Sequence, residues 1–200
     1  MNARRWSLWG WCLCVAMLPM ICRAQGLEVV ATLQAGPGNI TVTPQKRILI
    51  SLHPFYSPDM RVVELKPDGK LVPFPNAQWN SHSSKEGQVF DSVLGIQCDP
   101  QGVVWMLDNG LRTGSFPKVV AWDTVKNRLA RIIHLKPPVV PSRPIFPDNA
   151  FFNDLAVDSP HHALYISHSA GVEDSALIVI DLKTGEARRV LQGHESMAPK

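Results

Sequence analysis

The chain has 200 residues, of which 20 are Lys or Arg and 17 are Asp or Glu, giving a formal net charge of +3. Three of the basic residues, Arg4, Arg5 and Arg23, lie before position 25, where the sequence has no acidic residue. The remaining 17 basic residues balance the 17 acidic ones, so the charge of the mature chain gives no indication of a nucleic-acid partner.

The N-terminal segment has the order of a secretory signal. Two arginines precede an apolar run over residues 6–21, and a short exit ends at Ala24. The run is shorter than the ~20 residues that a membrane-spanning helix needs. We therefore expect a signal peptide at 1–24 and a mature domain at 25–200, secreted or periplasmic and with no stable membrane insertion after cleavage; a retained anchor is the alternative.

Cysteine usage changes with the signal. Cys12, Cys14 and Cys22 fall inside it, and only Cys98 remains, so the mature chain has no disulfide framework. Lipid modification of Cys22 is a further alternative, although Ile21 stands where such signals carry a small residue. Cys98 lies in an apolar alternation and is predicted to be an inert buried thiol rather than a nucleophile.

A pattern of strands and turns recurs three times. Its anchors Ile40, Ile96 and Leu155 are 56 and 59 residues apart, and each copy offers four short β-rich segments joined by turn residues. Such a repeat describes β-propeller blades, and its period exceeds the ~40–45 residues of WD-type repeats despite Trp122-Asp123. We predict an all-β fold, a β-propeller with about three four-stranded blades at residues 27–76, 89–136 and 150–194. The second strands are expected at 47–52, 103–107 and 163–167.

Three blades do not close a ring, because propellers use 4–8. Two interpretations follow: the chain is a fragment of a six-bladed protein, or two copies close the ring together. The first is favoured because an open half-propeller would expose two sheet faces and invite aggregation.

Several motifs resemble the major royal jelly protein/yellow family, in the family's order and over most of residues 27–194. The resemblance is to its bacterial members and to the N-terminal half of the family fold. It implies a secreted six-bladed propeller with a ligand pocket at one mouth of the central channel, but it does not fix the chemistry. The segments that carry it are Pro37–Val42, Ser51–Phe55, Asp91–Ile96, Val104–Gly110, Pro117–Asp123 and Phe152–Asp158.

Strand direction indicates which residues line that mouth. In an antiparallel blade, the start of the first strand and the end of the second lie at the same face. Reading those places gives Asn39 and Ser92 together with the predicted ligand-binding residues, which are His53, Asp91, Asp108, Asn109 and His168.

The same positions in the third repeat, Asn153 and Asp154, are the candidate metal ligands. Oxygen groups of this kind suit Ca²⁺ or another divalent cation. The pair also resembles the asparagine-containing strand start of gluconolactonase-type propellers. The competing interpretation, which applies equally to Asp108-Asn109, is that these side chains cap backbone groups in turns.

Two functions stay open at this point. One is a non-catalytic propeller that binds a small-molecule ligand; the other is a metal-dependent gluconolactonase-like hydrolase. No nucleophile elbow, phosphate loop or zinc-type histidine spacing is present, so no catalytic residue is assigned. The aromatic residues Trp105, Trp122 and Phe90 are expected to pack between blades. His161 and His162 are expected on the surface, in a turn on the opposite face.

Overall fold

The computed structural model describes residues 26–81, 88–140, 150–169 and 174–197. The chain divides into two compact units, residues 1–32 and 33–200. The predicted signal peptide, residues 1–24, lies outside the described residues, and the described part of the first unit, residues 26–32, contains no helix or strand. Within the ranges that the structure describes, no helix has the length and apolar character needed to cross a membrane.

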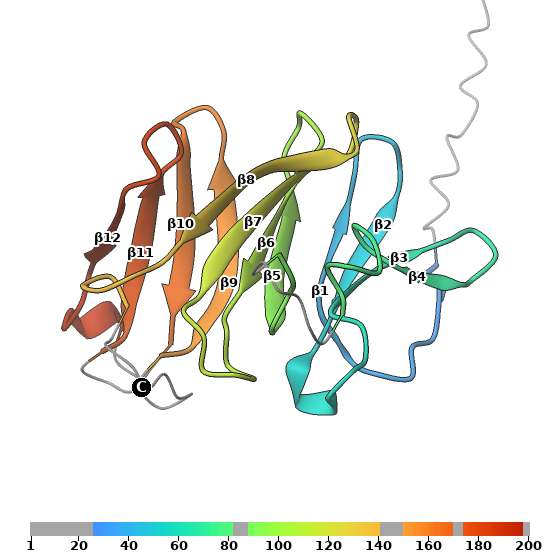
Figure 1. Ribbon diagram of the computed structural model, residues 1–200, viewed down its shortest axis with the longest axis horizontal. Helices are drawn as coiled ribbons and strands as arrows, with labels where there is room; N and C mark the ends of the chain where they lie inside the picture. Colours follow the sequence, from blue (N-terminus) through green and yellow to red (C-terminus); the bar gives the residue numbers. More distant parts are fainter. Residues whose placement is uncertain (1–25, 82–87, 141–149, 170–173, 198–200) are drawn as a thin grey trace, which may run out of the picture. The chain divides into compact units, whose positions relative to one another are not determined.

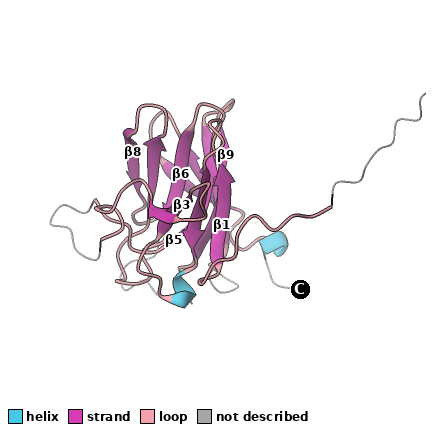
Figure 2. Cartoon of the chain, turned by 90° about the vertical axis from the view of Figure 1, so that its right-hand side faces the viewer, coloured by secondary structure: helices cyan, strands magenta, loops and turns pink. Residues whose placement is uncertain are grey.

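The second unit contains three antiparallel four-stranded sheets, each formed by strands that are consecutive in the chain (Figures 1 and 2). The first sheet comprises β1 (Pro37–Val42), β2 (Ile48–Leu52), β3 (Val62–Leu65) and β4 (Leu71–Pro73). The middle sheet comprises β5 (Val93–Cys98), β6 (Val103–Asp108), β7 (Lys118–Asp123) and β8 (Arg128–His134). The third sheet comprises β9 (Phe152–Asp158), β10 (Ala163–His168), β11 (Ala176–Asp181) and β12 (Ala187–Val190). The described helices are two single 3₁₀ turns, η1 (Pro54–Tyr56) and η2 (Glu195–Met197).

The register confirms that the three sheets are copies of one unit. The anchors of the sequence repeat all sit on the first strand, opposite equivalent residues of the second. The same pairing thus recurs in each sheet, and the predicted all-β fold is confirmed. The equivalent pairs are Ile40 with Ile50, Ile96 with Met106, and Leu155 with Ile166.

Two apolar clusters form on opposite faces of the middle sheet. Because side chains alternate along a strand, Val104 and Met106 of β6 join residues of the first sheet, whereas Trp105 and Leu107 join residues of the third. Trp105 and Trp122 are 8% and 7% exposed, which confirms the packing expected for both. Phe90 is also buried and lies against Trp79, with ring centroids 5.1 Å apart.

The first strands of neighbouring sheets contact one another and are cross-linked in the same way at both junctions. Cys98 N donates to Thr41 Oγ1 at 2.9 Å, and Val157 N donates to Gln97 Oε1 at 2.7 Å. Thr41 and Gln97 occupy equivalent positions on β1 and β5. At each junction, a side-chain acceptor on one first strand thus sets how far the next first strand is shifted along it.

Candidate functional site

The equivalent positions Asn39, Gly95 and Asp154 on the three first strands form a contact across the middle sheet. Asn39 Nδ2 donates to Asp154 Oδ1 at 2.9 Å, although 115 residues separate them. Gly95 makes the approach feasible, because a Cβ at this position would lie 2.6 Å from Asp154 Oδ1 and 2.9 Å from its Cα. The contact joins the first and third sheets near the start of their first strands.

Local hydrogen bonds orient both side chains. Asn39 N donates to Ser51 Oγ at 2.9 Å, and Asp154 N donates to Ser167 Oγ at 3.1 Å, so a serine on the second strand plays the same part in both sheets. Each side chain also accepts from the amide of the following residue: Asn39 Oδ1 from Ile40 at 2.7 Å and Asp154 Oδ1 from Leu155 at 2.8 Å.

Asn153 and Asp154 are both exposed. Asp154 Oδ2 has no hydrogen-bond partner within the ranges that the structure describes. This oxygen can therefore accept from, or bind to, a ligand. The same ranges contain no group of three or more His, Cys, Asp or Glu side chains arranged to hold a metal ion. Metal binding by Asn153 and Asp154 therefore stays a prediction.

Asp108 is fully buried and forms hydrogen bonds within its own sheet. Its Oδ1 accepts from Ser92 N at 2.8 Å and from Gly110 N at 3.3 Å. Its Oδ2 accepts from Asp91 N at 2.8 Å and forms an ion pair with Lys118 Nζ at 2.7 Å. The geometry matches backbone capping: this carboxylate ties the start of β5 to the end of β6, and its role in ligand binding stays a prediction.

Three buried polar atoms among the described residues have no hydrogen-bond partner: Ser92 Oγ, Asn109 Nδ2 and His168 Nε2. Buried polar groups are paired in the great majority of cases, so each such exception calls for an explanation. All three lie next to the start of a first strand or the end of a second strand, the positions from which the mouth was predicted.

His168 is held as a neutral ring. It is 1% exposed and stacks on Phe152 with ring centroids 4.5 Å apart. Its Nδ1 lies 2.8 Å from the carbonyl oxygen of Asp174 and 3.3 Å from Arg189 Nη2. Because a carbonyl oxygen only accepts, the shorter contact requires the proton on Nδ1, and in that tautomer Nε2 is an acceptor. Burial lowers the pKa of this imidazole, and the nearby Arg189 guanidinium lowers the pKa further.

His53 has a different environment. Its Nδ1 accepts from Phe55 N at 3.2 Å and caps η1, and its ring makes edge contacts with Phe55 and Tyr56. None of its described contacts reaches another predicted site residue. The structure thus links Asp91 with Asp108, and links Asn39 with Asp154, while His53 and His168 stand apart from both pairs.

Asp91 also borders a pocket of about 410 Å³ that sequence reasoning missed. Its Oδ2 accepts from Arg112 N at 2.9 Å and from Thr113 N at 3.3 Å. The cations Arg61, Arg112 and Lys118 line the pocket. Arg61 and Arg112 lie outside the motifs quoted above, and Arg61 is about 50 residues away from the other two in sequence.

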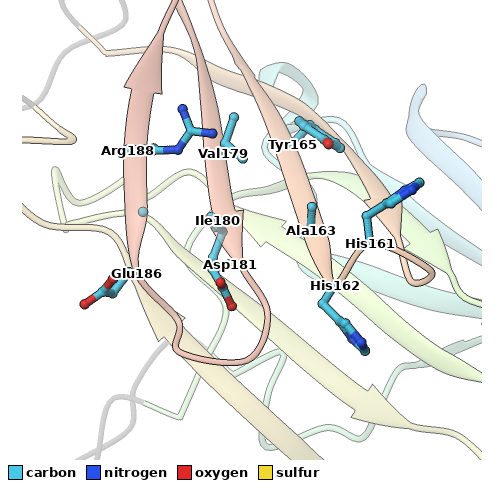
Figure 3. A pocket seen from close by; sticks show the side chains of 10 residues that line it. His161, His162, Ala163, Tyr165, Val179, Ile180, Asp181, Glu186 and Arg188 are labelled. Atoms are coloured by element: carbon cyan, nitrogen blue, oxygen red, sulfur yellow. The ribbon is translucent and has the colours of Figure 1, made fainter.

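A larger hollow of about 620 Å³ lies on the third sheet (Figure 3). It is lined entirely by this sheet and its turns, and includes Tyr165, Val179 and Arg188. The residues of the middle sheet equivalent to Tyr165 and Val179 are Trp105 and Ala121, which are buried against the third sheet. The hollow is therefore a sheet face of the kind that packs against a neighbour, rather than an enclosed ligand site.

The two turn histidines behave as expected, whereas Cys98 is less buried than predicted. His161 and His162 are exposed, and His161 Nδ1 contacts Asp158 Oδ2 at 2.8 Å within their turn. Cys98 is only half-buried, but burial and the neighbouring Asp99 raise the pKa of its thiol to about 11. The thiol is protonated at neutral pH, as expected for an unreactive cysteine.

No family model matches the chain, and no curated protein matches it. Solved structures do. The gluconolactonase XC5397 from Xanthomonas campestris is 16% identical with a TM-score of 0.54, over 81% of this chain and 50% of that one. The extracellular domain of BT4673 from B. thetaiotaomicron is 13% identical with a TM-score of 0.50, over 84% and 18%. Virginiamycin B lyase from Staphylococcus aureus is 10% identical with a TM-score of 0.46, over 77% and 40%.

The likenesses to the gluconolactonase and to the BT4673 domain define the class of the chain by fold alone. Its three four-stranded antiparallel sheets match part of a β-propeller, and the chain spans half or less of the length of each of these structures. Identities this low carry no information on substrate or activity.

Proposed function

We propose that this chain is a secreted β-propeller of the major royal jelly protein/yellow type that binds a small molecule at the mouth of its central channel. The observation that carries the proposal is the set of buried, unpaired polar atoms on Ser92, Asn109 and His168. Family membership and export are supported by the quoted motifs and by the N-terminal segment.

The chemistry of these atoms defines the kind of ligand. Asn109 Nδ2 is a donor, His168 Nε2 an acceptor, and Ser92 Oγ can be either. A ligand bearing hydroxyl or amine groups has partners for donors and acceptors of these kinds, and pairing them would relieve the cost of leaving them unpaired. Phe152 is fully buried and stacks on His168, so that the imidazole has an apolar neighbour. A small polar or aromatic molecule fits this combination.

Calorimetry on the mature protein against amines, phenolics and sugar lactones tests the proposal. We expect one of these classes to bind, and His168→Phe to weaken that binding by about tenfold through loss of one hydrogen bond to a desolvated partner. His161→Phe, at an exposed turn, is the matched control and should leave the affinity unchanged. A flat response to every class would remove the proposal.

Export has its own test. The exported protein should begin at or near Gln25, as N-terminal sequencing can show. Exported material that begins at Met1 would contradict this part of the proposal.

Metal-assisted hydrolysis is the second candidate, and the exposed, unpaired Asp154 Oδ2 beside Asn39 favours it. A cation there would polarise a carbonyl while a carboxylate activates water. Asp154→Asn should then lower metal content and lactone hydrolysis with little loss of stability, whereas a capping role predicts a loss of about 0.5–2 kcal/mol with binding unchanged. Hydrolysis that survives EDTA would exclude this candidate.

A further inference from the structure

The pocket beside Asp91 lies where the first and middle sheets meet. Arg61 directly precedes β3, Asp91 precedes β5, Lys118 begins β7, and the loop from Arg112 to Ser115 joins β6 to β7. We propose that this pocket is a second binding site, for a small organic carboxylate held by Arg112 and Lys118. The inference goes beyond the proposed function, because it uses none of the three unpaired atoms of the mouth.

Cations outnumber anions on the pocket wall. Its lining includes three basic side chains, Arg61, Arg112 and Lys118, and a single carboxylate, Asp91. Asp91 is already engaged, since its Oδ2 accepts from the amides of Arg112 and Thr113. Asp108 neutralises part of the charge of Lys118, but Asp108 itself is fully buried behind it. Arg61 is engaged as well, because its guanidinium donates to backbone carbonyl oxygens and lies within the electrostatic reach of Asp91, Asp108 and Asp59. Arg112 is therefore the cation of the pocket wall that has no carboxylate partner among the described residues.

Arg112 offers the free donors. Its only described side-chain contact is from Nη2 to the carbonyl oxygen of Pro58 at 3.1 Å, and no described carboxylate lies within ion-pair distance of its guanidinium. A guanidinium has five N–H donors in a plane that matches a carboxylate. Burial lowers the pKa of Arg61 and the charge on Arg112 lowers it further, while Asp91, Asp108 and Asp59 act in the opposite direction. An anion placed between the two cations would relieve this repulsion.

The loop that carries Arg112 is fixed before any ligand arrives. Asp91 holds the amides of Arg112 and Thr113, the Arg112 side chain is anchored to the first sheet through Pro58, and Ser115 N donates to Gly110 O at 3.0 Å. Because the donors are positioned in advance, binding costs little conformational entropy. Thr113 and Ser115 supply hydroxyl groups, and Phe90 supplies an apolar wall. A short carbon chain with a carboxylate head fits these surroundings.

The experiment is calorimetry of the mature protein with succinate as the probe, alongside dimethyl succinate as its uncharged counterpart and inorganic phosphate as a second anion. We expect succinate to bind, the diester not to bind, and phosphate to bind more weakly than succinate. Affinity should fall as salt is raised, because the interaction is ionic.

Variants locate the site. Arg112→Gln should weaken succinate binding by about tenfold or more, since it removes a charge-assisted contact, and Arg112→Lys should restore part of it. Arg188→Gln removes the same charge from the exposed face of the third sheet and should change nothing. Thermal unfolding of each variant verifies folding. His168→Phe should leave succinate binding intact, so a failure of the mouth proposal does not count against this one.

Four outcomes would overturn the inference: no succinate binding, equal binding of the diester, equal or tighter binding of phosphate, or unchanged binding in a folded Arg112→Gln protein. Should Arg112→Gln not fold, Ser115→Ala serves in its place, with a smaller expected loss of affinity for succinate.

Discussion

The middle and third sheets share one register but differ in burial. In β7 every residue except Asp123 is buried, whereas in the equivalent strand β11 buried and partly exposed residues alternate. Trp105 is buried, while its counterpart Tyr165 is only partly so. The middle sheet has described neighbours on both faces, and the third sheet has one on a single face. The alternation of apolar and polar residues in the sequence therefore predicts a strand, but the packing of neighbouring sheets determines how much of that strand is buried.

A comparison of the first and middle sheets shows the same dependence of burial on neighbouring sheets. Ile40 is 53% exposed, but its equivalent in the middle sheet, Ile96, is 2% exposed. Both are isoleucines at the same register position. The difference lies in what packs against them and not in the residue.

The largest effect should come from the middle sheet. Trp105→Ala removes a buried aromatic side chain and its hydrogen bond from Nε1 to Asp99 Oδ2, 3.0 Å long, and should cost about 3–5 kcal/mol of unfolding free energy. Urea denaturation followed by circular dichroism measures it. A loss below about 1 kcal/mol would break the comparison, since it would mean that the middle sheet gains little from its neighbours.

Next comes the buried ion pair. Asp108→Ala leaves Lys118 and three backbone amides without their acceptor and should cost about 3 kcal/mol. The double variant Asp108→Ala, Lys118→Met should cost less than the two single changes together, because the second removes a stranded charge. Denaturation of all three proteins gives the coupling. Strictly additive losses would show that Asp108 and Lys118 have no coupling energy and would contradict the expected ion pair.

At the equivalent position, the third sheet carries His168, and its effect should depend on pH. Burial lowers the pKa of this imidazole, so the unfolded chain binds the proton more readily than the folded one. Stability is thus full above the unfolded pKa, about 6.5, and is lost as the pH falls below it, with a slope of at most about 1.4 kcal/mol per pH unit.

His168→Gln should reduce that slope. Denaturation at pH 7.5 and at pH 5.5 measures the difference between variant and parent. His134, whose pKa is also lowered, is present in both proteins and cancels. Equal slopes would show that His168 is already solvated in the folded state.

The smallest effect should come from the partly exposed face of the third sheet. Tyr165→Ala should cost about 1 kcal/mol or less, because little apolar surface is covered there. The same denaturation assay as for Trp105→Ala gives a direct ratio between equivalent positions. A loss equal to that of Trp105→Ala would contradict the comparison and would mean that another surface covers Tyr165 in solution.

Sequence alone predicted the repeat because its signal is local. Alternating apolar residues around Ile40, Ile96 and Leu155, followed by turn residues, fix strands and hairpins without reference to anything distant. The cross-links from Thr41 and Gln97 to the next sheet were not predicted. An acceptor that bonds across a sheet junction looks in sequence like any exposed polar residue of a strand.

The site was harder to predict for a related reason. Strand direction placed Asn39 and Asp154 at one end of their sheets, and the structure joins them directly. The sequence could not distinguish a capping role from a ligand-binding role at Asp108, because both roles need a carboxylate at a strand end. Nor could it find Arg112, whose significance depends on a carbonyl 54 residues earlier.

Gly95 has a consequence for how this molecule can vary. Since any side chain there would collide with Asp154, the middle repeat contributes only main chain to the contact between Asn39 and Asp154. In a library of variants at these three positions, folded proteins should be found with several different residues at 39 and at 154, but with almost none other than glycine at 95. At this end of the sheets, the first and third repeats can therefore carry different side chains, whereas the middle repeat is restricted to glycine.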